Sequence, residues 1–216
     1  MECRQILYCT KTIIFIKRNN TQNGYKINRK PIIQFTASRY VNNMLIIHAT
    51  QKLLNTAGLP AIAYVTKPGD GQLLHSWYAT TFSSSFPGKM MTVYIHEPSM
   101  IAVVCKGKTI RHTWPQFLQR LPMLLQRCGF PAAILESELL MCSDFVVAKT
   151  SNRSMLGYMN QVIFDLEHNC RRFASWEEIS ETWLQNIVLN SLFGTKEPKR
   201  KYFSPLDYWK EELANL

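Results

Sequence analysis

Apolar and polar positions after residue 43 recur at the spacings of short strands and amphipathic helices. The apolar run at residues 45–47 predicts a buried strand. Thr50 then stands where a helix cap is expected, before a helical segment over residues 51–57 that ends at Gly58. This part of the chain is therefore expected to be a strand followed by one or two helical turns.

Three runs further along the chain have the composition of strands and are separated by short, turn-rich loops. They cover residues 73–82, 90–95 and 100–105. Because both loops are short enough for hairpins, the three runs predict an antiparallel meander.

Two helices are expected after the meander. Thr113 followed by Gln116 has the pattern of a capping box, which predicts a helix from Thr113 to Cys128. Pro122 lies inside this segment and should kink the helix. A shorter helix is expected over residues 131–141.

Residues 144–160 combine a continuous apolar run, a polar turn and a helical pattern. The run at residues 145–148 predicts a strand covered on both faces rather than an edge strand. In the helix that follows, one apolar stripe should face the core. Its members are Met155, Met159, Val162, Ile163 and Leu166.

Ser175 and Glu178 form a second capping-box pattern, which predicts a helix over residues 176–190. The order of the expected elements indicates an α+β domain. Its antiparallel meander would be extended into a mixed sheet of about five strands, with the helices packed on it.

Basic residues are unevenly distributed along the 216 residues, whose formal net charge is +10. Residues 1–43 carry eight Lys or Arg against one acidic residue, whereas residues 44–216 carry 17 basic and 14 acidic side chains. We interpret residues 44–216 as a single α+β domain. Residues 1–43 are interpreted as a basic extension, either disordered or upstream of a true start at Met44.

The six cysteines include no Cys-x-x-Cys pair and no Cys/His spacing typical of zinc sites. No window approaches the roughly 20 apolar residues that span a bilayer. The first residues also lack a secretory cleavage pattern. These features indicate a cytoplasmic protein with free thiols, no membrane association and no bound metal.

Three motifs carry a resemblance to a known family. They are residues 49–54, Trp77-Tyr78-Ala79 and the long central motif at residues 148–160, with a weaker echo at residues 202–207. They resemble an uncharacterised bacterial family, the domain of unknown function 6933, from Met44 to about Trp209. The resemblance implies a bacterial, cytoplasmic protein and brings no activity with it.

The turn at residues 149–154 and the helix after it are the first candidate site, for an anion or a partner. Backbone N–H groups at a helix N-terminus favour an anion, and the turn adds basic and hydroxyl side chains. The alternative is that a Ser or Asn in the turn only caps the helix. A glycine in mid-helix also suggests that something packs closely against the backbone there. The candidate residues are Lys149, Thr150, Asn152, Arg153, Ser154, Gly157 and Asn160.

Two further surfaces are candidates for binding. The helix face opposite Met159 holds Phe164, which is unusual for a solvated face, together with Gly157, Gln161 and His168. Either a later segment covers this face or a partner binds it. The other surface is a candidate nucleic-acid-binding cluster near aromatic residues, with a solvated basic loop as the alternative. Its residues are Lys199, Arg200 and Lys201.

Groups for catalysis are scattered, and no catalytic residue or cofactor is assigned. His96 and Glu97 fall in a predicted hairpin loop and are expected on the surface. The leading hypothesis is a non-enzymatic binding or regulatory module that recognises a protein or a nucleic acid. The alternative is an enzyme or sensor that acts on a phosphorylated small molecule or nucleotide at residues 149–154.

Overall fold

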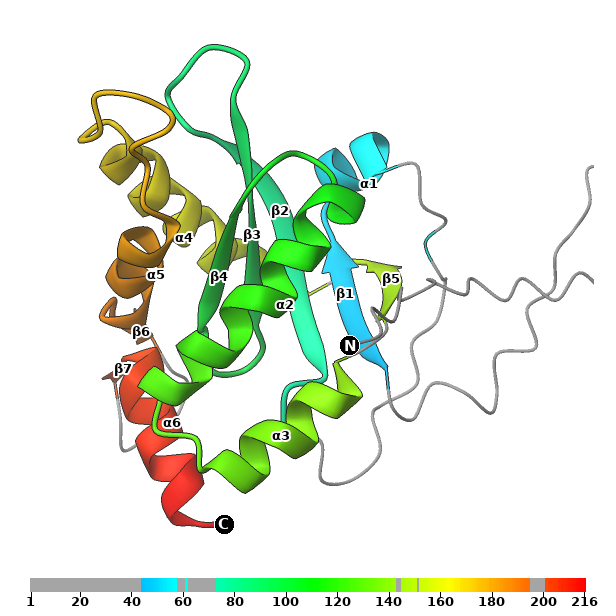
Figure 1. Cartoon of the computed structure of the whole chain (residues 1–216), viewed down its shortest axis with the longest axis vertical. Helices are drawn as coiled ribbons and strands as arrows, with labels where there is room; N and C mark the ends of the chain where they lie inside the picture. The colour runs from blue at the N-terminus through cyan, green and yellow to red at the C-terminus, as the bar shows by residue number, and fades with distance from the viewer. Residues whose placement is uncertain (1–43, 58–60, 62–72, 143–144, 151, 195–200) are drawn as a thin grey trace, which may run out of the picture. The chain divides into compact units, whose positions relative to one another are not determined.

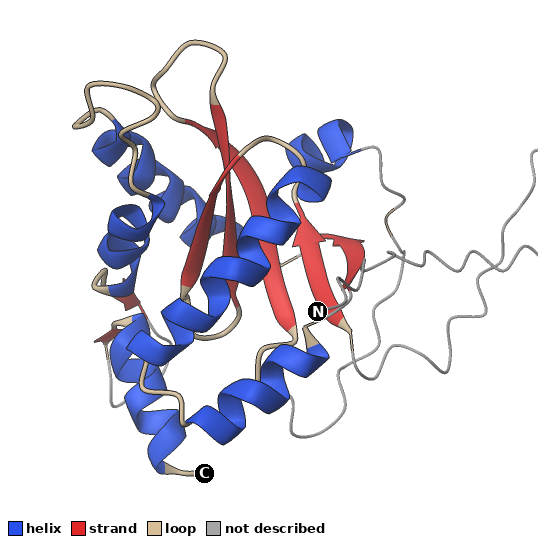
Figure 2. Ribbon diagram, in the orientation of Figure 1, coloured by secondary structure: helices blue, strands red, loops and turns tan. Residues whose placement is uncertain are grey.

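The structure is a computed structural model that describes residues 44–57, 61, 73–142, 145–150, 152–194 and 201–216. A five-stranded mixed sheet of order β4-β3-β2-β1-β5 lies between helices (Figures 1 and 2), which confirms the predicted α+β fold. Residues 1–43 lie outside the described residues, so the domain boundary at Met44 stays a prediction. The strands are β1 (Leu45–Ala49), β2 (Ser76–Ser83), β3 (Met90–His96), β4 (Ala102–Lys106) and β5 (Phe145–Lys149).

The predicted meander is confirmed, because β2, β3 and β4 pair antiparallel in chain order. Strand β1 pairs parallel with both β2 and β5, so that Ile47 lies opposite Trp77 on one side and Val147 on the other. Strand β1 is thus the element that joins the meander to β5.

Strand β5 lies at the edge of the sheet, so the expectation that it is not an edge strand is wrong. Phe145 and Val146 are only half buried. The ring of Phe145 packs against Trp114, with ring centroids 4.3 Å apart. Val147 and Ala148 are both buried, and because successive residues point to opposite faces, the apolar run reflects cover on both faces of an edge strand.

Six helices and a small hairpin complete the described fold. In the described part of the chain, none of the helices is long and apolar enough to cross a bilayer. The helices are α1 (Gln51–Ala57), α2 (Ile110–Arg127), α3 (Ala132–Met141), α4 (Arg153–Cys170), α5 (Glu181–Leu189) and α6 (Pro205–Ala214), and the hairpin is β6 (Phe193–Gly194) with β7 (Tyr202–Phe203).

The two faces of the sheet carry separate apolar cores, because successive side chains of a strand point to opposite faces. On one face, Trp77 packs with Phe117 of α2 and Trp209 of α6. On the other face, Tyr78 belongs to a cluster that includes Met159 of α4. Figure 1 shows α2 across the near face and α4 behind the sheet. The core stripe predicted for α4 is confirmed by the burial of Met155, Met159, Val162 and Leu166, with Ile163 packed at its edge.

Helix α2 begins at Ile110, so the predicted start at Thr113 is wrong. Thr109 is the cap, and its side chain accepts a hydrogen bond from the N–H of His112. Thr113 lies one turn inside the helix, where its hydroxyl donates to the carbonyl of Thr109 and lies 2.6 Å from the hydroxyl of Tyr94. Its side chain therefore links the helix to the sheet.

Helix α5 begins at Glu181 with Ser180 as its cap, later than predicted. The capping-box partners do interact, since the N–H of Glu178 donates to Oγ of Ser175 at 3.3 Å. Glu178 in turn accepts from the N–H of Ala174. These hydrogen bonds stabilise a turn that precedes the helix, and they do not cap the helix.

His96 is fully buried at the end of β3, and the prediction that it lies on the surface is wrong. Its ring lies near those of Trp77 and Trp209, and Nδ1 is 2.7 Å from Oγ of Ser99. Burial, with a smaller contribution from His75, lowers the pKa of His96 to about 3. The folded protein therefore holds this imidazole neutral.

Acid should destabilise the fold through His96. Between pH 6.5 and 3 the unfolded chain binds a proton at His96 that the folded chain excludes, so the free energy of unfolding falls as the pH falls. The loss from this group is at most about 1.4 kcal/mol per pH unit. Urea unfolding at several pH values should show a shallower pH dependence in His96→Gln than in the wild type. Equal dependence in wild type and His96→Gln would contradict the role of His96.

Candidate functional site

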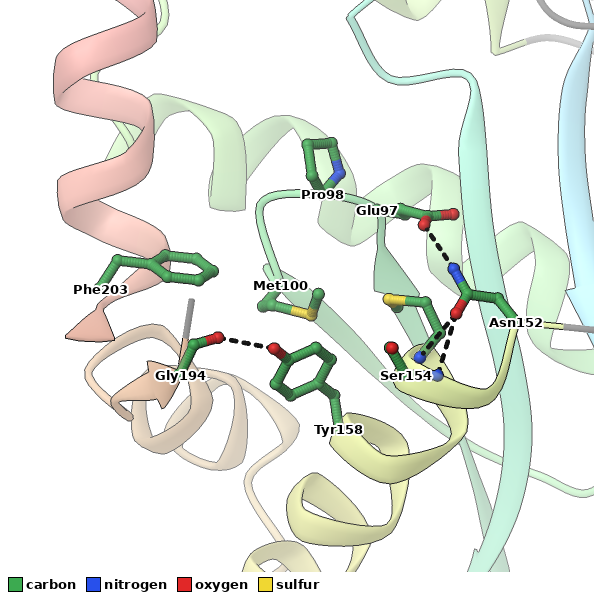
Figure 3. A pocket seen from close by; sticks show the side chains of 9 residues that line it. Glu97, Pro98, Met100, Asn152, Ser154, Tyr158, Gly194 and Phe203 are labelled. Carbon is green, nitrogen blue, oxygen red and sulfur yellow. Dashed lines mark hydrogen bonds between the residues drawn. The ribbon is translucent and has the colours of Figure 1, made fainter. Parts of the chain in front are cut away.

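A pocket of about 250 Å³ opens at the amino end of α4 (Figure 3). Three parts of the chain surround it: the turn between β3 and β4, the first turns of α4, and the β6–β7 hairpin. We call it the Glu97 pocket. Its lining residues are Glu97, Pro98, Met100, Asn152, Ser154, Met155, Tyr158, Gly194 and Phe203.

The turn after β3 places Glu97 at the pocket. The N–H of Glu97 donates to the carbonyl of Ser76, which holds the turn against the start of β2. The N–H of Met100 donates to the carbonyl of His96 and closes the turn. Met100 has a φ of 61°, a conformation that non-glycine residues seldom adopt. Its buried side chain lines the pocket between the turn and α4.

Asn152 joins this turn to α4. As the helix cap, its Oδ1 accepts hydrogen bonds from the N–H groups of Ser154 and Met155 at 3.0 and 3.2 Å. Its Nδ2 donates to Oε1 of Glu97 at 2.9 Å (Figure 3). A single side-chain amide thus satisfies the helix end and orients the carboxylate.

Tyr78 of β2 supports the same carboxylate from the sheet. Its phenol lies close enough to Glu97 and Asn152 for the charge of the carboxylate to act on it. Burial first, and the negative charge of Glu97 second, raise the pKa of Tyr78. The ring stacks on His48, with centroids 4.6 Å apart and planes inclined by 20°. The phenol is therefore neutral and packed beside Glu97.

Aromatic and apolar side chains form the other side of the pocket. Tyr158 donates from its hydroxyl to the carbonyl of Gly194 at 2.6 Å, which ties α4 to the β6–β7 hairpin. Figure 3 shows Phe203 and Tyr158 across the pocket from Glu97, with Met100 between them. The pocket thus combines one polar wall with one aromatic wall.

Glu97 is the one charged side chain among the nine that line the pocket. Neither ion pair found among the described residues includes it; both involve Glu181. The carboxylate therefore meets a neutral hydrogen-bond donor, the amide of Asn152, but forms no ion pair within the described chain. Its negative charge sets the electrostatic character of the pocket.

The sequence-predicted candidates are only partly brought together. Asn152 and Ser154 line the pocket. Oγ1 of Thr150 is buried without a hydrogen-bond partner in the described structure. Four other candidates, Lys149, Arg153, Gly157 and Asn160, are exposed and do not line it.

Close packing against Gly157 was expected and is wrong for the described residues: a Cβ added there would meet nothing within 4 Å. Phe164 on the outer face of α4 is 71% exposed. Gln161 and His168 are exposed beside it. No described segment covers this face, and partner binding there stays a prediction.

The candidate nucleic-acid cluster is described in part. Lys199 and Arg200 lie outside the described residues. Lys201 is exposed, and its Nζ lies 5.5 Å from the ring centroid of Tyr202. In the same described ranges, no group of three or more His, Cys, Asp or Glu is placed to hold a metal ion.

Sequence reasoning missed Glu97, Tyr78, Met100 and Phe203. Tyr78 lies inside the Trp77-Tyr78-Ala79 motif, which could have drawn attention to it. Glu97 carries no comparable local signal, because its partners come from elements distant in the chain.

A carboxylate at position 152 should destabilise the protein even though Asp caps helices as well as Asn does. Asn152→Asp replaces the donor to Glu97 by a second negative charge, which should lower the free energy of unfolding at pH 7 by roughly 1–3 kcal/mol. Adding Glu97→Gln should restore most of the loss. Urea unfolding of the two single variants and the double variant measures this coupling; an Asn152→Asp variant as stable as wild type would contradict it.

Comparison with known proteins places the chain in a family. A family model described as Domain of unknown function (DUF6933) matches residues 46–208, a range that contains the whole Glu97 pocket. The curated proteins include no significant match. The family match confirms the resemblance of the sequence motifs and covers most of the chain. The chain therefore belongs to the DUF6933 family.

Proposed function

We propose that the domain is a non-enzymatic binding module and that the Glu97 pocket is its recognition site for a partner protein. The observation that carries the proposal is a carboxylate held by Asn152, without a cation among the described residues, opposite an aromatic wall. Charged and aromatic groups converging in a concave site are typical of recognition. The compartment we propose is the bacterial cytoplasm; the four described cysteines are free and buried.

The chemistry around the pocket favours binding over catalysis. Ser154 is the hydroxyl on the polar wall, and no base among the described residues is hydrogen-bonded to it. His48 is stacked behind Tyr78, and burial lowers its pKa. Covalent catalysis needs a nucleophile within hydrogen-bond reach of its base, and these side chains do not supply that pair.

The charge favours a protein over a nucleic acid or a phosphorylated small molecule. A phosphate at the amino end of α4 would need the N–H groups of Ser154 and Met155, which already donate to Asn152. It would also approach the carboxylate of Glu97. Lys149 and Arg153, which could offset that repulsion, do not line the pocket. The phosphate-directed enzyme or sensor is thus the less supported alternative.

Filling the pocket should abolish ligand binding. Ser154→Leu places an apolar side chain in the pocket, whereas Gln161→Leu makes the same kind of change at an exposed position of α4. The full-length ¹⁵N-labelled chain is titrated with a panel of small cationic, neutral and anionic fragments. At least one fragment should shift the amides of Met100, Ser154 and Tyr158 saturably in wild type and Gln161→Leu, but not in Ser154→Leu. A panel that binds nowhere in the pocket would refute the proposal.

A further inference from the structure

We infer that the group bound in the Glu97 pocket is a primary ammonium, carried by a lysine side chain or by a small alkyl amine. The inference rests on the proposed function, because it names the chemistry of the ligand for that site. It follows from the charge of the pocket, the hydrogen bonds already made there and the nature of its opposite wall.

The charge of the pocket favours a cation. Glu97 is half buried, so its carboxylate has lost part of its hydration, and its described hydrogen-bond partner is the neutral amide of Asn152. A cationic donor would form a charge-assisted hydrogen bond, which is stronger than bonds between neutral groups. A neutral or anionic ligand would leave the carboxylate without a counter-charge.

The amino end of α4 opposes a cation, but less strongly. A helix terminus corresponds to roughly half an elementary charge, against the full charge of a carboxylate. Oδ1 of Asn152 also accepts hydrogen bonds from the first free N–H groups of the helix. The sum of these charges at the polar wall therefore remains negative.

The hydrogen bonds favour an ammonium over a guanidinium. A guanidinium binds a carboxylate best as a fork that uses both oxygens together. In the Glu97 pocket, Oε1 already accepts from Asn152, and the phenol of Tyr78 lies beside the carboxylate. An ammonium needs only one remaining lone pair, and its other hydrogens can reach the hydroxyl of Ser154 or water.

The opposite wall suits the stem of such a ligand. Phe203 and Tyr158 face the pocket, and aromatic rings attract ammonium groups within about 6 Å. Met100 and Met155 offer apolar contact to methylene groups. The volume of about 250 Å³ is below that of sites for drug-sized ligands and suits an unbranched chain of a few carbons.

The inference is tested by titrating the full-length ¹⁵N-labelled chain at constant ionic strength with four probes. They are n-butylamine, Nα-acetyl-lysine methylamide, its Nε-acetylated neutral analogue and the matching arginine derivative. Both amines should shift the amides of Met100, Ser154 and Tyr158 saturably. The neutral analogue and the arginine derivative should bind about tenfold more weakly or worse.

Two matched variants identify the acceptor. Glu97→Gln should weaken amine binding about tenfold, whereas Glu136→Gln, at an exposed carboxylate on α3, should leave it unchanged. Phe203→Leu should weaken it severalfold through loss of the aromatic face. Thermal unfolding of each variant shows that a lost signal reflects the pocket and not the fold.

The outcomes distinguish a lysine side chain from a free amine as the ligand. They also distinguish a failure of the ammonium inference from a failure of the proposed binding function. Tighter binding of the lysine derivative than of butylamine supports a protein side chain, and the reverse supports a free amine. Binding of neutral fragments or inorganic phosphate without amine binding would overturn the ammonium and leave the pocket as a recognition site. Amine binding that Glu97→Gln does not change would also overturn it. No binding by any probe or fragment would overturn both proposals.

Discussion

The parallel pairing of β1 with both β2 and β5 is the constraint on which the described domain depends. It joins the β2–β4 meander to β5, in a register that sets Ala49 beside Ala79 and Lys149. Helix α4 starts shortly after β5, so this pairing brings the cap residue Asn152 within 2.9 Å of Glu97. The polar wall of the pocket exists because two segments, 55 residues apart at this contact, meet there.

Features set by local periodicity could be predicted from the sequence, and those set by distant pairing could not. The meander follows from runs of strand-like composition between short loops, and the apolar stripe of α4 from spacings of three to four residues. The edge position of β5 depends on which strands pair with β1, and the apolar run of β5 does not indicate its pairing partners. The capping-box patterns predicted the wrong starts for α2 and α5. The true caps, Thr109 and Ser180, lack the Glu or Gln three residues later that defines a capping box.

The local part of the candidate site could be predicted from the sequence, and the part that depends on distant contacts could not. Asn152 and Ser154 belong to a recognisable turn before a helix, so the sequence pointed to them. Glu97 looked like a surface residue after a strand, and its role appears only when Asn152 and Tyr78 are placed against it. That carboxylate also changes the expected ligand, because a turn that seemed suited to an anion lies beside a negative charge.

The central claim is that Glu97 makes this pocket a site for a cationic ligand. A crystal structure of the full-length chain soaked with n-butylamine tests it most directly. We predict density for the amine between Glu97 and Phe203, with its nitrogen within hydrogen-bond distance of the Glu97 carboxylate. A pocket that holds the amine in another orientation, or a side chain of the protein itself against Glu97, would contradict the claim.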